Sequence, residues 1–133
     1  MSGAAIVGAL LRADVALLGL VPAARIKNER LPDDAPLPTV VVREISSSDR
    51  QTLKQRQFVR SVDRVSVTVR AANLRERDAV LKLVRAACAG KLGSIAECER
   101  VSVLTAGKGP GLAGPANSYE RPQDFSVSYD APL

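Results

Sequence analysis

The sequence predicts an α+β fold in which a single-layer, mostly antiparallel sheet carries two main helices packed on one face. Residues 4–20 and 73–89 repeat apolar side chains every three or four positions, which is the period of an amphipathic helix. Other stretches are rich in β-branched residues or alternate apolar with polar residues, as strands do. The order helix, strands, helix, two strands is typical of an antiparallel sheet with helices on one face.

The N-terminal region is expected to be helical over residues 4–20. Its apolar stripe consists of Val7, Leu10, Leu11, Val15 and Leu18. Asp14 is expected to cap a second short helix that ends at Gly19, because aspartate favours the N-cap and glycine the C-terminal end. Residues 25–30 predict a short edge strand. Residues 31–38 contain three prolines, so they predict a stiff connection rather than a helix.

Two strands are expected in the middle of the chain. Residues 39–45 (TVVVREI) predict a central strand with both faces partly covered. This strand is expected to end at Ser46, and the polar residues 46–57 to form an exposed arm or wide hairpin. Val65, Val67 and Val69 then alternate with polar residues. One face of that strand therefore belongs to the core, and the other is exposed to solvent or lies at an interface.

A second long helix is expected over residues 73–89. Asn73 with Glu76 three positions later forms a capping box, and Gly90 follows as a stop signal. The expected buried stripe is Leu74, Leu81, Val84 and Cys88, flanked by Val80 and Ala87. Asp78 and Lys82 are spaced as an i,i+4 ion pair on the opposite side.

Two further strands are expected at residues 99–104 and 121–129. In the second, Phe125, Val127 and Tyr129 share one face. Between them, residues 107–118 (GKGPGLAGPANS) contain four glycines and two prolines, which predicts an irregular loop. Unstructured loops of this length are usually functional or order on a partner, so we interpret it as an assembly loop.

Composition limits the possible functions of the 133-residue chain, which is the length of one domain, residues 1–133. Histidine is absent, so histidine-based catalytic triads and histidine-ligated metal sites are excluded. Two cysteines cannot build a disulfide framework. No uninterrupted apolar stretch approaches the roughly 20 residues of a spanning helix, so no membrane contact is expected.

The formal net charge of +5 raises the question of nucleic-acid binding. The densest basic cluster is Arg50, Lys54, Arg56, Arg60 and Arg64. Only Phe58 among the four aromatic residues lies within it, whereas single-strand binders combine basic grooves with several stacking aromatics. The pattern therefore favours incidental affinity for phosphates over specific recognition.

The candidate chemical motifs are weak. The GKGPG segment is not a phosphate-binding P-loop, because Lys108 precedes the glycines and a strand, not a helix, is expected next. Asp33 and Asp34 lie in a proline-rich turn, where we expect solvated carboxylates rather than an acid and base pair. Cys88 is expected in the core and Cys98 half exposed, without a nearby base to activate either thiol.

Several segments together resemble the phage tail completion or tail terminator family, small α+β proteins of long-tailed bacteriophages, prophages and gene transfer agents. These segments are LLRADVALLGLV (residues 10–21), Arg25 and Ile26, LPTVVVREI (37–45), the polar 46–50, the valine-alternating strand 63–71 leading into helix 73–89, and DFSVSYDAPL (124–133). The resemblance covers most of the chain and rests on element order and general character.

The resemblance implies a non-catalytic virion protein without cofactors or metal, made in the bacterial cytoplasm. It would cap the tail tube as a ring of six copies, stop tail growth and form the joint to the head. Its partners would be other copies, the tail tube protein and the head-tail connector or neck protein. DNA would pass through the ring without sequence-specific binding. We expect assembly contacts at Arg50, Lys54, Arg56, Arg60, Arg64, Lys108, Leu112 and Asn117.

Three alternatives remain open at this stage. A head-tail connector or neck subunit shares the ring geometry. A small basic nucleic-acid-binding module would show strongly salt-dependent DNA affinity. An enzyme would need a pocket with perturbed carboxylates or a low-pKa thiol.

Overall fold

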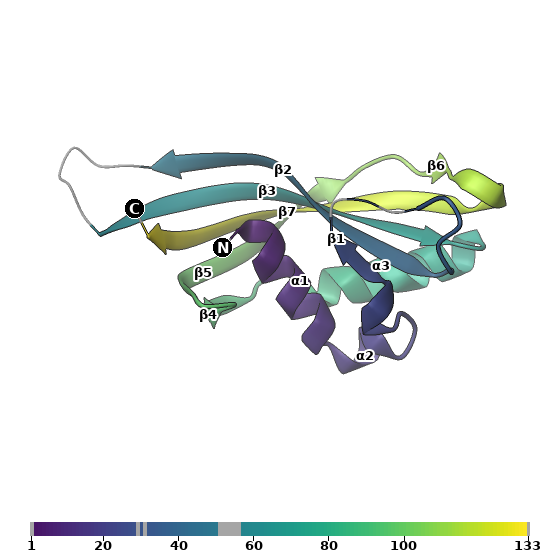
Figure 1. Cartoon of the computed structure of the whole chain (residues 1–133), viewed down its shortest axis with the longest axis horizontal. Coiled ribbons are helices and arrows are strands. Elements are labelled where there is room, and N and C mark those ends of the chain that lie inside the picture. The colour runs from purple at the N-terminus through teal and green to yellow at the C-terminus, as the bar shows by residue number, and fades with distance from the viewer. Residues whose placement is uncertain (1, 29, 31, 51–56, 133) are drawn as a thin grey trace.

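The computed structural model describes residues 2–28, 30, 32–50 and 57–132. Its central feature is a curved sheet of seven strands in the order β1-β2-β3-β7-β5-β4, with β6 pairing beside β7. All three α-helices lie against one face of the sheet, and the opposite face is largely free of them (Figure 1). The sheet is antiparallel apart from the pairing of β1 with β2. The predicted α+β fold with helices on one face is confirmed.

The helices begin and end where the capping residues predict. Helix α1 spans Gly3–Ala13, and α2, a single turn, spans Val15–Leu18 with Asp14 at its N-cap. The side chain of Asp14 accepts a hydrogen bond from the amide of Ala16 at 3.2 Å. Helix α3 spans Leu74–Cys88, and the side chain of Asn73 accepts from the amide of Glu76 at 2.8 Å. A short 3-10 turn, η1 (Ala23–Arg25), precedes the first strand.

Strands β2, β3, β5 and β7 are longer than the sequence predicts, whereas β1 is shorter than the edge strand expected at residues 25–30. Strand β1 spans Ile26–Asn28 at the sheet edge, β2 spans Thr39–Arg50 and β3 spans Phe58–Ala71. Strands β4 and β5 span Leu92–Ile95 and Cys98–Lys108. Strand β6 covers Leu112–Ala113, the 3-10 turn η2 covers Pro115–Asn117, and β7 spans Tyr119–Pro132.

The core lies between the helices and one face of the sheet. Val65, Val67 and Val69 of β3 and Phe125 and Val127 of β7 are fully buried, as their alternation predicts. From the helix layer, α1 supplies Ile6, Val7 and Leu11, and α3 supplies Val80, Leu81, Val84 and Cys88. The period-2 and period-3.6 patterns therefore meet in one apolar layer.

Three residues lie elsewhere than expected. Val15 is 83% exposed, because α2 turns away from the axis of α1 at Asp14 and Leu17 takes the buried position instead. Leu74 is half exposed, since it begins α3 where the helix approaches the end of the sheet. Cys98 is buried rather than half exposed, because it faces the core from the first position of β5.

The expected arm is partly sheet. Residues 46–50 were expected to leave the sheet, but they continue β2 past a register shift near Ile45 and pair with β3 from Arg60 to Arg64. The polar sequence is compatible with this extension because a long antiparallel hairpin satisfies its backbone groups without burying side chains. Residues 51–56, the rest of the expected arm, lie outside the described residues.

The glycine-rich segment is also more regular than predicted. Lys108 pairs with Gln123 and Leu112 with Glu120, so β5 and β6 follow almost the same register along β7. The amide of Gly109 donates to the carbonyl of Pro122 at 3.0 Å in between. Residues 107–118 are therefore the end of a long hairpin whose turn is η2, and the glycines admit a backbone kink, with Gly107 at φ +95°.

Candidate assembly surface

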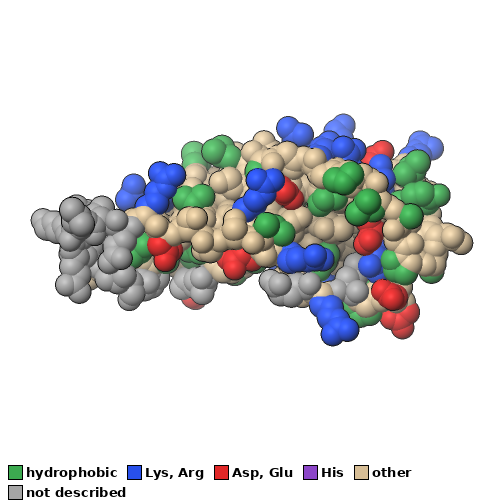
Figure 2. Space-filling view, turned by 90° about the horizontal axis from the view of Figure 1, so that it is seen from above, with side chains coloured by type: hydrophobic (Ala, Val, Ile, Leu, Met, Phe, Trp, Pro, Cys, Tyr) green, Lys and Arg blue, Asp and Glu red, His purple; other side chains and the backbone are tan. Residues whose placement is uncertain are grey.

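The sheet face opposite the helices carries a row of ion pairs between two neighbouring strands. Arg60 of β3 pairs with Asp130 of β7 at 3.1 Å, and Arg64 pairs with Asp124 at 2.7 Å. Farther along, Arg70 pairs with Glu120 at 3.3 Å. Figure 2 shows this face, with blue and red side chains interspersed among tan and green ones. The face is thus of mixed charge rather than a basic surface.

Two predicted contact residues belong to this row. Besides its ion pair, Arg60 donates a hydrogen bond to the carbonyl of Arg100 at 2.7 Å, and Arg64 donates to that of Ala106 at 3.3 Å. Both guanidinium groups are thereby held in the sheet by their own chain. The sequence could not reveal this, because the acidic partners lie 60 and 70 residues away along the chain.

The other predicted basic residues lie at or beyond the end of the β2–β3 hairpin. Arg50 is exposed at the last position of β2, directly opposite Arg60. Lys54 and Arg56 lie outside the described residues. The hairpin extends past the helix layer at the left of Figure 1, so this end of the sheet is uncovered by helices.

The remaining predicted contacts lie near the opposite end of the sheet. Leu112 is 59% exposed in β6, and Asn117 is exposed in η2 at φ +60°. The amide of Gly114 donates to the carbonyl of Ser118 at 2.8 Å, and the Ser118 hydroxyl donates to that of Pro115 at 2.7 Å. The turn is therefore internally braced, which presents its tip in a defined shape. Those predicted contacts that the structure describes thus fall into two groups.

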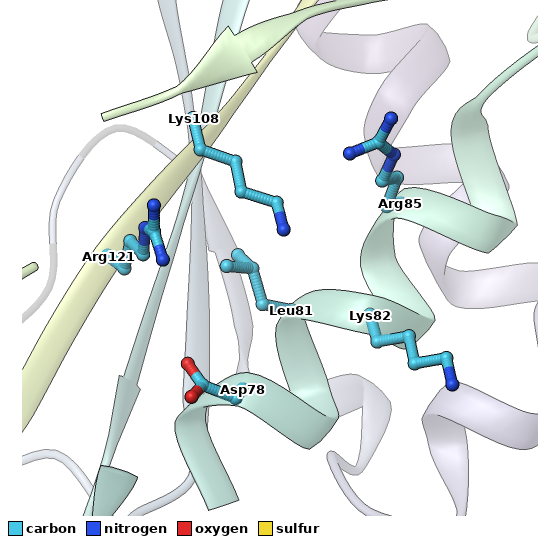
Figure 3. A pocket seen from close by; sticks show the side chains of 6 residues that line it. All are labelled: Asp78, Leu81, Lys82, Arg85, Lys108 and Arg121. Carbon is cyan, nitrogen blue, oxygen red and sulfur yellow. The ribbon is translucent and has the colours of Figure 1, made fainter. Parts of the chain in front are cut away.

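A basic cavity of about 450 Å³ opens between α3 and the β5 edge of the sheet. It is lined by Asp78, Leu81, Lys82, Arg85, Lys108 and Arg121. Figure 3 shows Arg85, Lys108 and Arg121 around the opening above Leu81, whereas Lys82 points away from it. Of these four cations, sequence reasoning singled out only Lys108 as a contact.

The charge of this cavity is not neutralised within the described part of the chain. The expected Asp78 to Lys82 pair is replaced by one between Asp78 and Arg77, at 3.1 Å. Arg121 donates through Nε to the carbonyl of Gly109 at 3.0 Å, which fixes its guanidinium at the rim. None of the four lining cations has an ion pair among the described residues. The cavity is therefore suited to an anionic group.

A buried carboxylate joins the N-terminus of α1 to the sheet. Asp63 of β3 is fully buried and accepts hydrogen bonds from the amide of Gly3 at 2.7 Å, the hydroxyl of Ser47 at 2.6 Å and the hydroxyl of Tyr129 at 2.8 Å. Burial, together with the hydrogen bond to Asp63, raises the pKa of Tyr129 above its usual value. Three donors and a helix N-terminus offset the cost of burying this charge.

The thiols are not poised for nucleophilic chemistry. Burial, reinforced by the Asp14 carboxylate, raises the pKa of Cys88 to about 12. Burial raises the pKa of Cys98 as well. Within the described ranges, no group of three or more acidic or cysteine side chains is placed to hold a metal ion. No helix in that part of the chain is long and apolar enough to cross a membrane.

Exposed apolar side chains accompany the charges on and around the sheet. Leu92 of β4 is 77% exposed and Leu104 of β5 is 61% exposed. Phe58 begins β3 and is half exposed. Sequence reasoning did not select these three residues as contacts. Leu104 could have been found, because it follows the buried Val103 in a strand and so faces the opposite side of the sheet. A small domain with a long, half-covered sheet and apolar side chains among charges has the surface of a subunit that binds other proteins.

The comparisons with known proteins agree with this class. The family model described as "Tail completion protein gp17" matches residues 5–108, so the chain belongs to the tail completion protein family. It is accordingly a structural component of a phage-type tail and of the virion. The comparison with curated proteins finds no significant match.

A solved structure shares the fold. A chain described as "Virion of native gene transfer agent (GTA) particle" superposes with a TM-score of 0.70, covering 98% of this chain and 96% of that one. The two sequences are 16% identical. The likeness therefore confirms the arrangement of helices and strands over nearly the whole length, including residues 109–132 beyond the family match.

Proposed function

We propose that this protein caps the end of the tail tube as a ring of six copies, stops tail growth and forms the joint to the head. The family match over residues 5–108 carries the proposal. The fold shared with a chain of a gene transfer agent virion supports it, because that chain is also part of an assembled particle. The action is steric and requires no chemical step: a ring bound to the end of the tube covers the surface that the next tube subunits would bind.

The surface of the chain suits a subunit that contacts neighbours on several sides. The β2–β3 hairpin extends from one end of the sheet and the β6 turn lies near the other (Figure 1). The two ends of the sheet would then contact different components, one on the tube and the other on the head side. The sheet face between them carries ion-paired side chains of both charges, which fits a surface close to neighbours of either charge.

Deletion of the gene from its home element tests this function. Particle production is induced and the lysate is imaged by negative-stain electron microscopy. Overlong or irregular tails are expected, and a plasmid copy of the gene restores normal length. Tails of normal length lying apart from filled heads would instead assign the protein to the head-tail connector. Fully normal, infectious particles would contradict both roles.

A further inference from the structure

The basic cavity and an acidic turn are formed by different elements of the fold. The cavity opens beside β5, and Asp33 and Asp34 lie in the connection between the edge strand β1 and β2. We propose that the cavity of one copy binds the Asp33 and Asp34 carboxylates of the next copy. This contact rests on the proposed ring, for which it supplies the subunit-to-subunit joint.

The acidic turn is exposed and held in shape. The amide of Ala35 donates to the carbonyl of Pro32 at 3.3 Å, which closes the turn around the two aspartates. Arg70 Nη1 donates to the same carbonyl at 2.9 Å, which ties the turn to β3. Asp33 and Asp34 are both exposed, and neither has an ion pair within the described part of the chain. Two adjacent carboxylates are thus presented on a braced support.

Other acidic side chains fit the cavity less well. Asp124, Asp130 and Glu120 already pair with arginines of β3. Glu99 accepts a hydrogen bond from the hydroxyl of Ser94 at 2.7 Å. Glu97 is a single carboxylate in the turn between β4 and β5. Asp33 and Asp34 are the only two acidic residues that are adjacent in the sequence.

The cavity has the charge and size to receive this turn. Arg85, Lys108 and Arg121 surround the opening above the apolar side chain of Leu81 (Figure 3). A water molecule occupies about 30 Å³ of liquid, so a volume of about 450 Å³ admits a pair of side chains rather than one small ion. No aromatic side chain lines the cavity, which disfavours a stacked nucleic-acid base.

The contact is head-to-tail, because the two surfaces that meet are different. Such heterologous contacts close into a ring when each copy is rotated by the same fraction of a turn. The chain thus carries both halves of a joint that can repeat around a ring.

Charge reversal with mutual rescue tests the contact in assembled particles. The variants are Asp33→Lys with Asp34→Lys, Arg85→Glu with Lys108→Glu, and all four together. Each double variant is expected to lower the amount of this protein per particle at least ten-fold, and the quadruple variant to restore it to within about three-fold, because attraction returns with the opposite sign. Glu97→Lys and Arg75→Glu are matched controls, which should assemble normally. Thermal unfolding of each purified variant verifies that it folds.

A disulfide test locates the contact directly. Asp34→Cys combined with Lys108→Cys should give an oxidised ladder of multimers from particles, whereas either single variant should not. The native thiols add little background because both are buried. Absence of the ladder together with absence of rescue would overturn the proposal. A second result would also overturn it: DNA affinity that falls more than ten-fold in the Arg85→Glu, Lys108→Glu variant and is unchanged in the Asp33→Lys, Asp34→Lys variant. The cavity would then bind DNA phosphate rather than the acidic turn.

The outcome is independent of the gene-deletion test. Overlong tails on deletion without rescue by the quadruple variant would leave the capping function standing and reject this contact. Normal particles on deletion, with a disulfide ladder formed by the purified protein, would reject capping and support the contact between copies.

Discussion

At the scale of single residues, Asp63 is the side chain on which the attachment of α1 to the sheet depends. Asp63→Asn retains the size of the side chain but replaces one accepting oxygen with an NH2 group, which cannot accept from the donors around it. The substitution also removes the negative charge opposite the helix N-terminus. Hydrogen bonds to charged groups contribute about 1.5–3 kcal/mol, so the free energy of unfolding is expected to fall by about that amount. Urea denaturation followed by circular dichroism measures it. Asp49→Asn, at an exposed carboxylate that accepts from Ser61, is the control; equal losses in both variants would contradict the special role of Asp63.

Cys88 makes stability depend on pH at the alkaline end. Its thiol loses a proton near pH 9.0 in an unfolded chain but holds it to about pH 12 in the fold. The folded state therefore binds more protons above pH 9, and the free energy of unfolding falls as the pH rises from about 9 toward 12, by up to about 1.4 kcal/mol per unit. Cys88→Ala, measured between pH 8 and 11, should show a shallower decline than the natural chain. An identical decline would assign the alkaline loss to other groups, such as Tyr129.

At the scale of elements, the sequence predicts most of what local patterns can encode. Strands β3 and β7 were identifiable because their two faces differ in polarity, and α3 because Asn73 and Glu76 mark its start. Strand β4 was missed since it has four residues and contains Gly93. Strand β6 was missed because its two residues stand among glycines and prolines, and only pairing with β7 makes them extended.

The candidate site was less predictable than the fold for the same reason. The acidic partners of Arg60 and Arg64 come from β7, and the cavity combines residues of α3, β5 and β7. Strand register over such separations is fixed by the whole sheet rather than by any local pattern. Spacing in the sequence therefore identified charged candidates but could not distinguish those that are paired within the chain from those that are free.

The hairpin turn between β6 and β7 is expected to act in assembly and not in folding. Replacing residues 114–118 by Asn-Gly joins Ala113 to Tyr119 through a two-residue turn suited to antiparallel strands. The free energy of unfolding should change by less than about 1 kcal/mol, because shortening a loop costs little and Asn117 is exposed. Incorporation into particles, measured by quantitative blotting, should be lost. A replacement of equal length, GSGSS, separates loss of length from loss of sequence, and assembly with the two-residue turn would rule out a contact at this tip.

At the scale of the whole molecule, the net charge of +5 is distributed in a way that disfavours tight DNA binding. Three arginines of β3 are neutralised by acids of β7, and the four cavity cations, which have no ion pair among the described residues, form a recess rather than a stripe. DNA affinity falls with salt at a logarithmic slope of about −0.9 for each phosphate neutralised. If only the four cations that line the cavity engage DNA, the slope for this protein should be no steeper than about −4.

Fluorescence anisotropy with a labelled duplex between 50 and 200 mM salt measures this slope. The paired variant Arg64→Gln with Asp124→Asn removes an ion pair without changing the net charge, so its affinity should stay within about two-fold of the natural chain. A slope between about −5 and −9, as expected for proteins that make 6–10 phosphate contacts, would favour the nucleic-acid-binding alternative. A loss of affinity in the paired variant would further place the DNA on the sheet face, because Arg64 would then be contacting phosphate despite its carboxylate partner.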